Sequence, residues 1–393
     1  MAWRGKYYSL PRLILVCVTT MAITDLLLFV LGRTIWESSV NDELGNELGI
    51  GLIAESPKFL RTKMGVKTNQ TLSVQVPPEQ QEDSADEVGY LGFMTQQGAV
   101  QLERRAHLKQ ACARHPELSQ GGLNNFTLRH LYAHEKHKIL YCFVPKVGCS
   151  NWKRVLMVLS DQRNSTDEIS NDDAHFKNGM ERLSGLSPAE QQHRLKTYTK
   201  FMYTRQPFIR ILSVYMNKFA DIKVYRSDPY FQMIAKRIMK RYRKDATTRE
   251  LKTGENMTWY EWTSYLTNPS EKANFDDHWQ EIYKMCSPCK VNYDYLGWLE
   301  TIGDDAKYML TALNLEDTVS YPTKANSHPT NSSETYKFFS HNTNKTTLGK
   351  LWEVYQTDFE LFGYPKPDLE CFYYYVDPNV VRNFTKCKTI CEK

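Results

Sequence analysis

Two short stretches of this sequence combine basic and hydroxyl side chains at a spacing that suits the binding of phosphate-like anions. The first runs from Pro145 to Arg154 (PKVGCSNWKR) and the second from Arg205 to Ser213 (RQPFIRILS). Lys146 brings a full positive charge to the first stretch. In the second, Arg205 can direct two parallel N–H donors to one anion, and Ser213 adds a hydroxyl group. Both stretches therefore predict contacts to phosphate or sulfate groups.

The first stretch follows a predicted buried strand at residues 139–144 and precedes a predicted helix at residues 152–159, for which Ser150 and Asn151 are candidate caps. A helix N-terminus presents free N–H groups and about half a positive charge to a nearby anion. Without a partner motif, an ordinary strand–turn–helix with a solvated lysine explains the pattern equally well. The candidate binding residues of this turn are Pro145, Lys146, Val147, Gly148, Cys149, Ser150 and Asn151.

The second stretch lies at a similar junction, between a predicted strand at residues 199–204 and an amphipathic helix at residues 207–219. Pro207 suits the first turn of a helix, where its missing N–H has no partner to lose. Arg210 either faces the ligand or pairs with an acid. The candidate binding residues here are Arg205, Pro207, Phe208, Arg210 and Ser213.

The first turn differs from the nucleotide-binding loop of ordinary ATPases and GTPases. That loop needs two glycines and a Gly-Lys-Ser/Thr ending, whereas this turn contains only Gly148. A nucleotide-dependent kinase is further disfavoured because no pair of magnesium-binding acids is evident. The sequence thus indicates a phosphate-like ligand bound in another way.

An apolar run at residues 13–31 predicts a membrane anchor. Twelve of its residues are Leu, Ile, Val or Phe, which together favour insertion by roughly 4–7 kcal/mol, while Asp25 opposes it by about 2.5–3.5 kcal/mol. The basic residues Arg4, Lys6 and Arg12 precede the run and predict a cytoplasmic N-terminus with a lumenal body. A cleaved signal peptide is the main alternative.

Glycosylation sequons and cysteines also indicate a lumenal body. Of nine cysteines, eight lie beyond the apolar run, an even number that suits an oxidising compartment. A lumenal body, at a net charge of only +5, disfavours nucleic acid as a partner. The seven Asn-x-Ser/Thr sequons are at Asn69, Asn125, Asn164, Asn256, Asn331, Asn344 and Asn383.

The chain divides by composition into a short tail, an anchor and a lumenal part. We expect a cytoplasmic tail at residues 1–12, the anchor at 13–31, and a polar stem without sustained periodicity at 32–101. Residues 102–367 alternate helical and strand-like patterns, including a third predicted strand at 291–296 before a helix at 304–313. This predicts an α/β fold with a parallel sheet flanked by helices. A cysteine-bearing tail follows at 368–393.

The two anion-binding stretches, in this order, closely resemble motifs of the Golgi carbohydrate sulfotransferases of the HNK/chondroitin 4-O type, sulfotransferase family 2. The first resembles their 5′-phosphosulfate loop and the second their 3′-phosphate motif. The resemblance spans roughly residues 102–367 and implies a P-loop-like fold and a single-pass Golgi membrane enzyme. Further matching segments lie at residues 193–198, 278–279, 286–289, 293–297, 300–301 and 359–364.

The resemblance implies 3′-phosphoadenylyl sulfate (PAPS) as the sulfate donor. Lys146, the loop amides and Ser150 are then expected to hold the 5′-phosphosulfate, with Arg205 and Ser213 on the 3′-phosphate. Transfer to a sugar hydroxyl needs a base for that hydroxyl and a cation for the charge that builds on the leaving phosphate. Lys146 suits the second role, so no metal is expected.

For the base, His175 is the leading candidate, because its segment resembles a family stretch that carries a histidine between the two phosphate motifs. His278 is the rival, with support of the fold by hydrogen bonding as its other possible role. The implied acceptor is a glycosaminoglycan or glycoprotein glycan, sulfated at the 4-hydroxyl of N-acetylgalactosamine or the 3-hydroxyl of glucuronate. The sequence does not choose between these two.

The sequence departs from the family pattern at Gln206, where an acid is usual, and at Ile209, where Glu is frequent. Loss of an acid beside Arg205 and Arg210 leaves a catalytically inactive, glycan-binding relative as the alternative function.

Three further segments each have two readings. The pair Cys286 and Cys289 predicts a disulfide or two separate bridges rather than zinc. The basic segment at residues 236–244 fits either a polyanionic glycan or a solvated helix face. The aromatic helix at residues 259–266 is expected in the core rather than on a sugar-binding surface.

Overall fold

The computed structural model describes residues 78–322, 335, 338, 339 and 341–366. The chain divides into two compact units, residues 1–84 and 85–393, and the structure below is that of the second unit. The predicted anchor and most of the predicted stem lie outside the described residues, as does the C-terminal tail. Within the described part of the chain, no helix combines the length and apolarity needed to cross a membrane.

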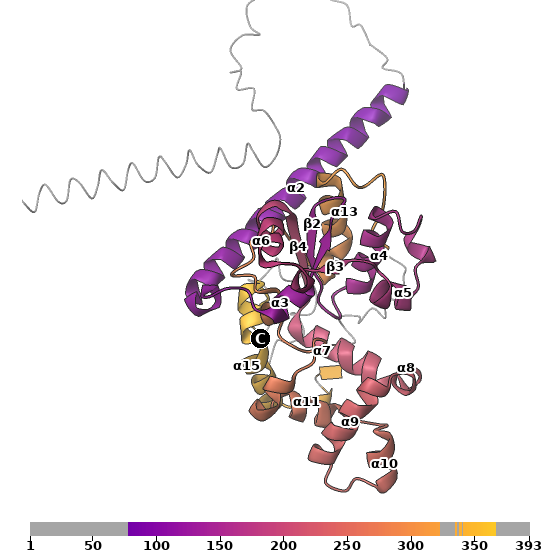
Figure 1. Cartoon of the computed structure of the whole chain (residues 1–393), viewed down its shortest axis with the longest axis vertical. Coiled ribbons are helices and arrows are strands. Elements are labelled where there is room, and N and C mark those ends of the chain that lie inside the picture. The colour runs from indigo at the N-terminus through magenta and orange to yellow at the C-terminus, as the bar shows by residue number, and fades with distance from the viewer. Residues whose placement is uncertain (1–77, 323–334, 336–337, 340, 367–393) are drawn as a thin grey trace, which may run out of the picture. The chain divides into compact units, whose positions relative to one another are not determined.

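A five-stranded sheet with the order β3-β1-β2-β4-β5 forms the centre of the domain (Figure 1). β2 (Ile139–Cys142), β4 (Thr199–Thr204) and β5 (Tyr295–Trp298) run parallel, and their side chains are largely buried. β1 (Leu131–His134) and β3 (Glu181–Arg182) are antiparallel to their neighbours. The predicted parallel arrangement is therefore confirmed for β2, β4 and β5, which carry the candidate site. The sheet as a whole is mixed, because β1 and β3 are antiparallel to their neighbours. β1 and β2 pair antiparallel because only four residues connect them.

Two predicted strands agree closely with the structure and one is shifted. β2 and β4 lie where the apolar runs predict them. The third strand begins at Tyr295 instead of residue 291. The reason is a turn: the N–H groups of Lys290 and Val291 both donate to the carbonyl of Ser287, so the chain is still turning at this point.

The helices lie around the sheet and, from α7 to α11, gather beyond one end of it (Figure 1). The α-helices after α2 are α3 (Asn125–His130), α4 (Cys149–Leu159), α5 (Asn171–Phe176), α6 (Pro188–Thr197), α7 (Pro207–Tyr215), α8 (Ile222–Ser227), α9 (Pro229–Tyr242), α10 (Thr248–Thr253), α11 (Trp259–Leu266), α12 (Ile282–Cys286), α13 (Ile302–Ala312) and α15 (Lys345–Leu361). The 3-10 turns are η1 (Pro116–Ser119), η2 (Thr166–Glu168), η3 (Leu183–Gly185), η5 (Pro269–Asn274) and η6 (Leu299–Thr301), and η4 (Met216–Ala220) is a π-helix.

The long helix α2 (Pro78–Arg114) crosses the expected boundary between stem and domain at residues 101 and 102. Its Gln101 side chain exchanges two hydrogen bonds with the backbone of Leu296, at 3.2 and 2.9 Å. Arg104 binds Asp305 at 2.8 Å. These contacts hold α2 against β5 and α13. The polar sequence of this segment did not predict a helix. The partners of its polar side chains are backbone groups and an acid that lie about 200 residues later in the chain, so local sequence does not reveal them.

Two disulfides join distant parts of the domain. Cys112 bonds Cys289, and Cys142 bonds Cys286. The pair at 286 and 289 thus forms two separate bridges, one of the two alternatives. Cys149 is the free cysteine among the described residues, and it is buried. The four sequon asparagines in the described part of the chain are all exposed, at Asn125, Asn164, Asn256 and Asn344.

Candidate active site

The loop between β2 and α4 forms a turn with its backbone in the left-handed region at two positions. Lys146 has φ 69° and Gly148 has φ 80°. Gly148 is the N-cap of α4, so Ser150 and Asn151, which we expected as caps, lie inside the first turn of the helix instead. A Cβ atom at Gly148 would lie 2.5 Å from the Tyr321 hydroxyl oxygen, so this position has no room for a side chain. The Asn151 N–H already donates to the Gly148 carbonyl at 3.1 Å, so the N–H groups of Cys149 and Ser150, at the very start of α4, are the ones that suit an anion.

Lys146 is fixed at the centre of the turn. Its Nζ donates to the Asn217 Oδ1 atom at 3.0 Å. Burial, and the nearby charges of Arg205 and Lys218, lower the pKa of Lys146 to about 8. Asn217 and Lys218 belong to the π-helix η4, and single π turns are frequent at functional sites. A half-buried ammonium with Arg205 and Lys218 nearby is stabilised by a bound anion.

Arg205 comes directly after β4 and connects the two anion-binding stretches. Its Nη1 donates to the carbonyl of Lys146 at 3.2 Å. Arg205 is buried, and this burial lowers its pKa to about 10, against the opposing effect of Glu300. The two strand–helix junctions that the sequence predicted are therefore adjacent at the carboxyl ends of parallel strands, where ligands of such sheets bind.

The two departures from the family pattern are accommodated by the fold. The Gln206 side chain caps α7, because its Oε1 accepts the N–H of Ile209 at 2.8 Å. An acid beside Arg205 is supplied from elsewhere: Glu300 accepts the Gln206 N–H at 2.8 Å and lies close enough to Arg205 to affect its pKa. Ile209 is buried in the core. The structure thus removes the specific reason for expecting a defective site.

Arg210 is fully buried and binds three backbone carbonyls. It contacts Pro145 at 3.1 Å, Gln280 at 2.7 Å and Asp277 at 2.9 Å. We expected Arg210 either to face the ligand or to pair with an acid, but these three hydrogen bonds go to backbone carbonyls. Arg210 instead connects the β2–α4 loop to the segment that precedes α12.

The other expected binding residues lie in the same region but differ in exposure. Ser213 lies on α7 and is nearly buried, as are Pro145, Val147, Cys149, Pro207 and Phe208. Phe208 packs against Phe339 and Phe359 in the core. The Asn151 side chain donates to the carbonyl of Pro322 and accepts from Arg154. Within the β2–α4 turn, Lys146, Ser150 and the backbone N–H groups are therefore the parts left to meet a ligand.

His175 lies near the C-terminal end of α5 and contacts α4 through both ring nitrogens. Its Nε2 is 2.8 Å from the Ser150 Oγ, and its Nδ1 is 3.4 Å from the Lys153 Nζ. Burial lowers the pKa of His175 to about 4, with further lowering from the charges of Lys153 and His278. Arg154 helps to hold α5 here through bonds to Ile169 and Asn171.

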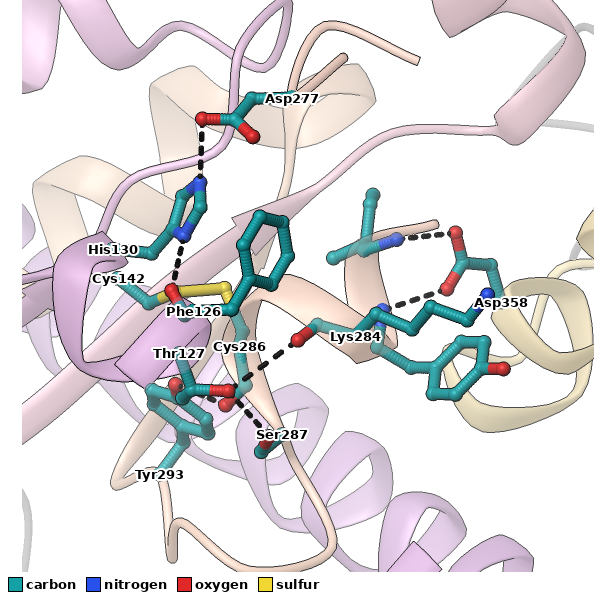
Figure 2. The surroundings of a disulfide bond; sticks show 12 residues. Phe126, Thr127, His130, Cys142, Asp277, Lys284, Cys286, Ser287, Tyr293 and Asp358 are labelled. Atoms are coloured by element: carbon teal, nitrogen blue, oxygen red, sulfur yellow. Dashed lines mark hydrogen bonds and ion pairs between the residues drawn. A yellow bond between two sulfur atoms is a disulfide. The ribbon is translucent and has the colours of Figure 1, made fainter. Parts of the chain in front are cut away.

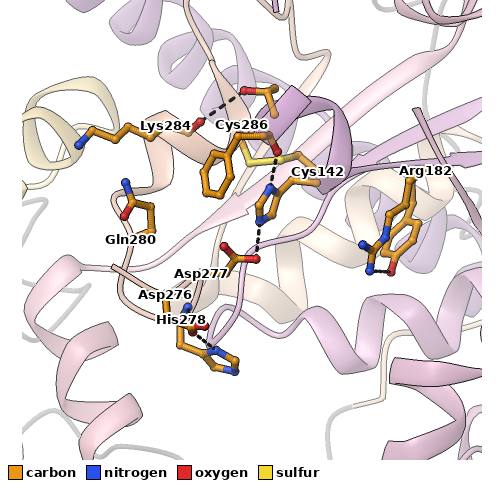
Figure 3. Close-up of polar contacts among 12 residues, drawn as sticks. Cys142, Arg182, Asp276, Asp277, His278, Gln280, Lys284 and Cys286 are labelled. Atoms are coloured by element: carbon orange, nitrogen blue, oxygen red, sulfur yellow. Dashed lines mark hydrogen bonds and ion pairs between the residues drawn. A yellow bond between two sulfur atoms is a disulfide. The ribbon is translucent and has the colours of Figure 1, made fainter. Parts of the chain in front are cut away.

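His278 comes from the segment between η5 and α12, and it is held by one acid (Figure 3). Its Nδ1 is 2.6 Å from the Asp276 Oδ1, which also accepts the His278 backbone N–H at 2.9 Å. The other oxygen of Asp276 accepts the Tyr230 hydroxyl at 2.7 Å. Burial would raise the pKa of Asp276, yet the hydrogen bonds from His278 and Tyr230 lower it to about 2.

The disulfide between Cys142 and Cys286 ties the end of β2 to the α12 region (Figure 2). Beside it, the His130 ring contacts the Phe126 carbonyl at 2.7 Å and Asp277 at 3.2 Å. Asp358 accepts the N–H groups of Ile282 and Tyr283 at the start of α12. The segment that carries His278 is thus held at both of its ends.

Some site residues were missed by the sequence reasoning. Lys153, Asn217, Lys218, Asp276 and Tyr230 all contact or influence the residues above. Lys153 lies within the first anion-binding stretch but had no role assigned to it, and the other four stand in no motif with a distinctive spacing. Asp276, two residues before His278, offered the one usable signal, because an Asp-x-His spacing permits a local hydrogen bond. In the described part of the chain, no cluster of three or more His, Cys, Asp or Glu residues is arranged to hold a metal ion.

The structure bears on the alternatives left open for the basic segment at residues 236–244 and the aromatic helix at residues 259–266. Arg241 and Arg243 in the basic segment pair with Glu271 and with Glu250 and Glu261. In the aromatic helix, Trp259, Trp262 and Tyr265 are buried, which confirms the core reading, while Tyr260 is exposed.

Comparison with known proteins gives consistent matches over the domain that contains this site. Residues 129–365 match the model of the family described as "Sulfotransferase family". The chain is 37% identical to rat carbohydrate sulfotransferase 11 over 245 residues, which cover 61% of this chain and 68% of the relative. It is 33% identical to mouse carbohydrate sulfotransferase 8 (68% and 64% covered) and 34% identical to zebrafish carbohydrate sulfotransferase 14 (68% and 72% covered). No solved structure matches significantly.

Proposed function

The chain belongs to the sulfotransferase family, and from that premise we propose that it transfers sulfate from PAPS to a hydroxyl group of a carbohydrate. The relatives it matches are named carbohydrate sulfotransferases, which supports a carbohydrate acceptor. The observation that carries the proposal is the junction of Lys146 and Arg205, where two helix N-termini and two cations meet.

This arrangement fits a donor with two separate anionic groups. PAPS supplies a sulfuryl group attached to a phosphate that can leave, and it carries a second phosphate on the ribose. Lys146, the first N–H groups of α4 and Ser150 would hold the phosphosulfate. Arg205 and Ser213 would hold the 3′-phosphate. Lys146 stabilises the negative charge that grows on the leaving phosphate, a role that needs no metal.

The acceptor is a glycan hydroxyl, and its proton goes to a histidine of the site. Both sulfation positions expected from the sequence are carried forward: the 4-hydroxyl of N-acetylgalactosamine and the 3-hydroxyl of glucuronate. We also propose that residues 13–31 anchor the enzyme in the Golgi membrane with the catalytic domain in the lumen. The two disulfides and the exposed sequon asparagines support an oxidising, glycosylating compartment.

The test is transfer of labelled sulfate from PAPS by the purified full-length chain in detergent. The acceptors are desulfated chondroitin, desulfated dermatan and a glucuronyl-terminated glycan, assayed separately. Wild type should label one of them, and Lys146→Ala should lose the transfer. Lys136→Ala is the matched control, because Lys136 is half exposed in the β1–β2 turn, at the opposite end of β2.

Each result has a clear reading. Equal transfer by wild type and Lys146→Ala contradicts the assigned role of the lysine. Binding of PAPS with no transfer to any of the three acceptors contradicts the proposed acceptor class.

A further inference from the structure

Asp276 fixes which nitrogen of His278 carries the proton. A carboxylate only accepts hydrogen bonds, so the Nδ1 at 2.6 Å must be the protonated nitrogen of the ring. The lone pair of the neutral ring is then on Nε2, which Figure 3 shows on the far side of the ring from Asp276. The His278 side chain is 29% exposed, so part of the ring is open to a second molecule.

The opposite assignment follows for His175. The ammonium of Lys153 only donates, so the Nδ1 of His175 at 3.4 Å accepts and its Nε2 carries the proton. That Nε2–H points to the Ser150 Oγ at 2.8 Å. In the neutral ring of His175, the lone pair that could accept a proton is on Nδ1 and is directed at the ammonium of Lys153. Neither nitrogen is then available to accept a proton from an acceptor sugar.

The groups around His278 keep it neutral but can stabilise it when it gains a proton. Burial lowers the pKa of His278, Asp276 opposes that effect, and the charges of Lys218 and Lys146 lower the pKa further. The centre of the Phe231 ring lies 5.1 Å from the centre of the His278 ring. The Lys218 Nζ lies over the same Phe231 ring, 4.5 Å from its centre. These influences place His278 in the same cluster as the loop lysine.

We propose that His278, held by Asp276, is the base of the transfer reaction, and that His175 is a positioning residue for Ser150. This inference rests on the proposed function and assigns roles within its site. It replaces His175, the candidate favoured by sequence, with the rival His278.

The oxygen of the sugar hydroxyl forms a bond to sulfur, and its proton passes to the Nε2 of His278. The bond between sulfur and the oxygen of the 5′-phosphate breaks, and its electron pair leaves with adenosine 3′,5′-bisphosphate. The positive charge formed on the His278 ring lies against the Asp276 carboxylate, which holds the imidazolium in place as an acid does in other histidine-dependent sites.

His175 acts at the donor instead. Because its Nε2–H donates to the Ser150 Oγ, the Ser150 hydroxyl hydrogen is free to point to the phosphosulfate. Loss of His175 should therefore weaken donor binding, whereas loss of His278 should slow transfer at unchanged donor binding.

The test compares His278→Asn with His175→Asn in the full-length enzyme. Asn keeps a hydrogen-bonding side chain but cannot act as a base at neutral pH. We expect His278→Asn to lower kcat by about 10²- to 10⁴-fold, the usual contribution of a general base. Its dissociation constant for adenosine 3′,5′-bisphosphate, measured by calorimetry, should stay unchanged. His175→Asn should raise that constant and the KM for PAPS, and should reduce kcat far less.

Two controls keep the result readable. His193→Asn alters an exposed histidine on α6 and should behave as wild type. Retained binding of adenosine 3′,5′-bisphosphate shows that His278→Asn is folded, and an unchanged melting temperature shows the same for His175→Asn. The inference is overturned if His278→Asn keeps kcat, or if His175→Asn alone loses kcat with donor binding intact. Absence of transfer by wild type with every acceptor instead contradicts the proposed function itself.

A pH profile supplies a second readout. The base must be neutral, so kcat/KM falls as pH falls through the pKa of His278. The charged or titrating groups that act on it are Asp276, Lys146, Lys218 and His175. Because Asp276 raises the pKa of His278, Asp276→Asn should move the acidic limb to lower pH. The 3′-phosphate of the donor titrates near pH 6 in every variant, so the comparison between variants is what decides. An acidic limb unmoved in Asp276→Asn counts against His278 as the base.

Discussion

The guanidinium of Arg210 donates its Nε–H to the carbonyl oxygen of Pro145 at 3.1 Å. The same side chain binds the carbonyls of Gln280 and Asp277, on either side of Trp279 and within two residues of His278. One buried residue of α7 therefore sets the position of the donor loop relative to the segment that carries the proposed base.

We expect Arg210→Lys to reduce both stability and transfer. Lysine keeps the charge but cannot make three divergent hydrogen bonds, and each hydrogen bond to a charged group contributes about 1.5–3 kcal/mol. The free energy of unfolding, from denaturant titration, should fall by about 3 kcal/mol or more on this basis. At a pH and a temperature at which the variant stays folded, the fold-decrease in kcat should exceed the fold-decrease in affinity for adenosine 3′,5′-bisphosphate. A variant with wild-type stability would contradict the bridging role.

Local sequence patterns predicted the parts of this site that depend on neighbours along the chain. The strands before Pro145 and Arg205, and the helices after them, follow from apolar runs and from Pro207. The role of Arg210 did not follow, because its carbonyl partners are 65 to 70 residues away and have no side-chain signature.

The same limit explains the choice of base. His175 and His278 are distinguished by whether a carboxylate or an ammonium faces the Nδ1 atom. The Asp276 partner is visible two residues before His278, but the Lys153 contact depends on how α5 packs against α4. The motif around His175 therefore predicts a place next to the β2–α4 loop, where the structure puts this residue, but it carries no information on which ring nitrogen is protonated.

The activity should also fall at alkaline pH because Lys146 must be charged. Its pKa is lowered to about 8, and loss of the proton removes the cation that stabilises the leaving phosphate. The kcat/KM for PAPS should therefore decline as pH rises through about 8. Lys146→Arg should remove this limb, since arginine stays charged, although its different shape should lower the rate at pH 7. The measurement is the initial rate of sulfate transfer at low PAPS from pH 6 to 10; an alkaline limb retained by Lys146→Arg would assign it to another group.

Gly148→Ala should damage the donor loop through two separable effects. A Cβ here would lie 2.5 Å from the Tyr321 hydroxyl oxygen and 3.0 Å from the Ile302 Cδ1, and the φ of 80° disfavours any side chain by roughly 1–2 kcal/mol. We expect weaker binding of adenosine 3′,5′-bisphosphate and a lower melting temperature. Adding Tyr321→Phe removes the closest atom, so the double variant should recover part of both losses. Purely additive losses in the double-mutant cycle would show that the steric contact is not the cause.

The two disulfides should differ in their effect on activity. Each closes a long loop, of 144 residues for Cys142–Cys286 and 177 for Cys112–Cys289, so removing either should cost about 2–5 kcal/mol of stability. Cys142 directly precedes the donor loop, and Cys286 ends the helix that follows the His278 segment, so Cys142→Ala/Cys286→Ala should also lower kcat. Cys112→Ala/Cys289→Ala is the matched control, because that bridge joins the C-terminal part of α2 to a turn beyond α12. Assays of transfer and thermal unfolding on both double variants should therefore show similar losses of melting temperature, with the loss of kcat confined to the first pair. Equal kcat in the two variants would mean that the Cys142–Cys286 bridge stabilises the fold without setting the geometry of the site.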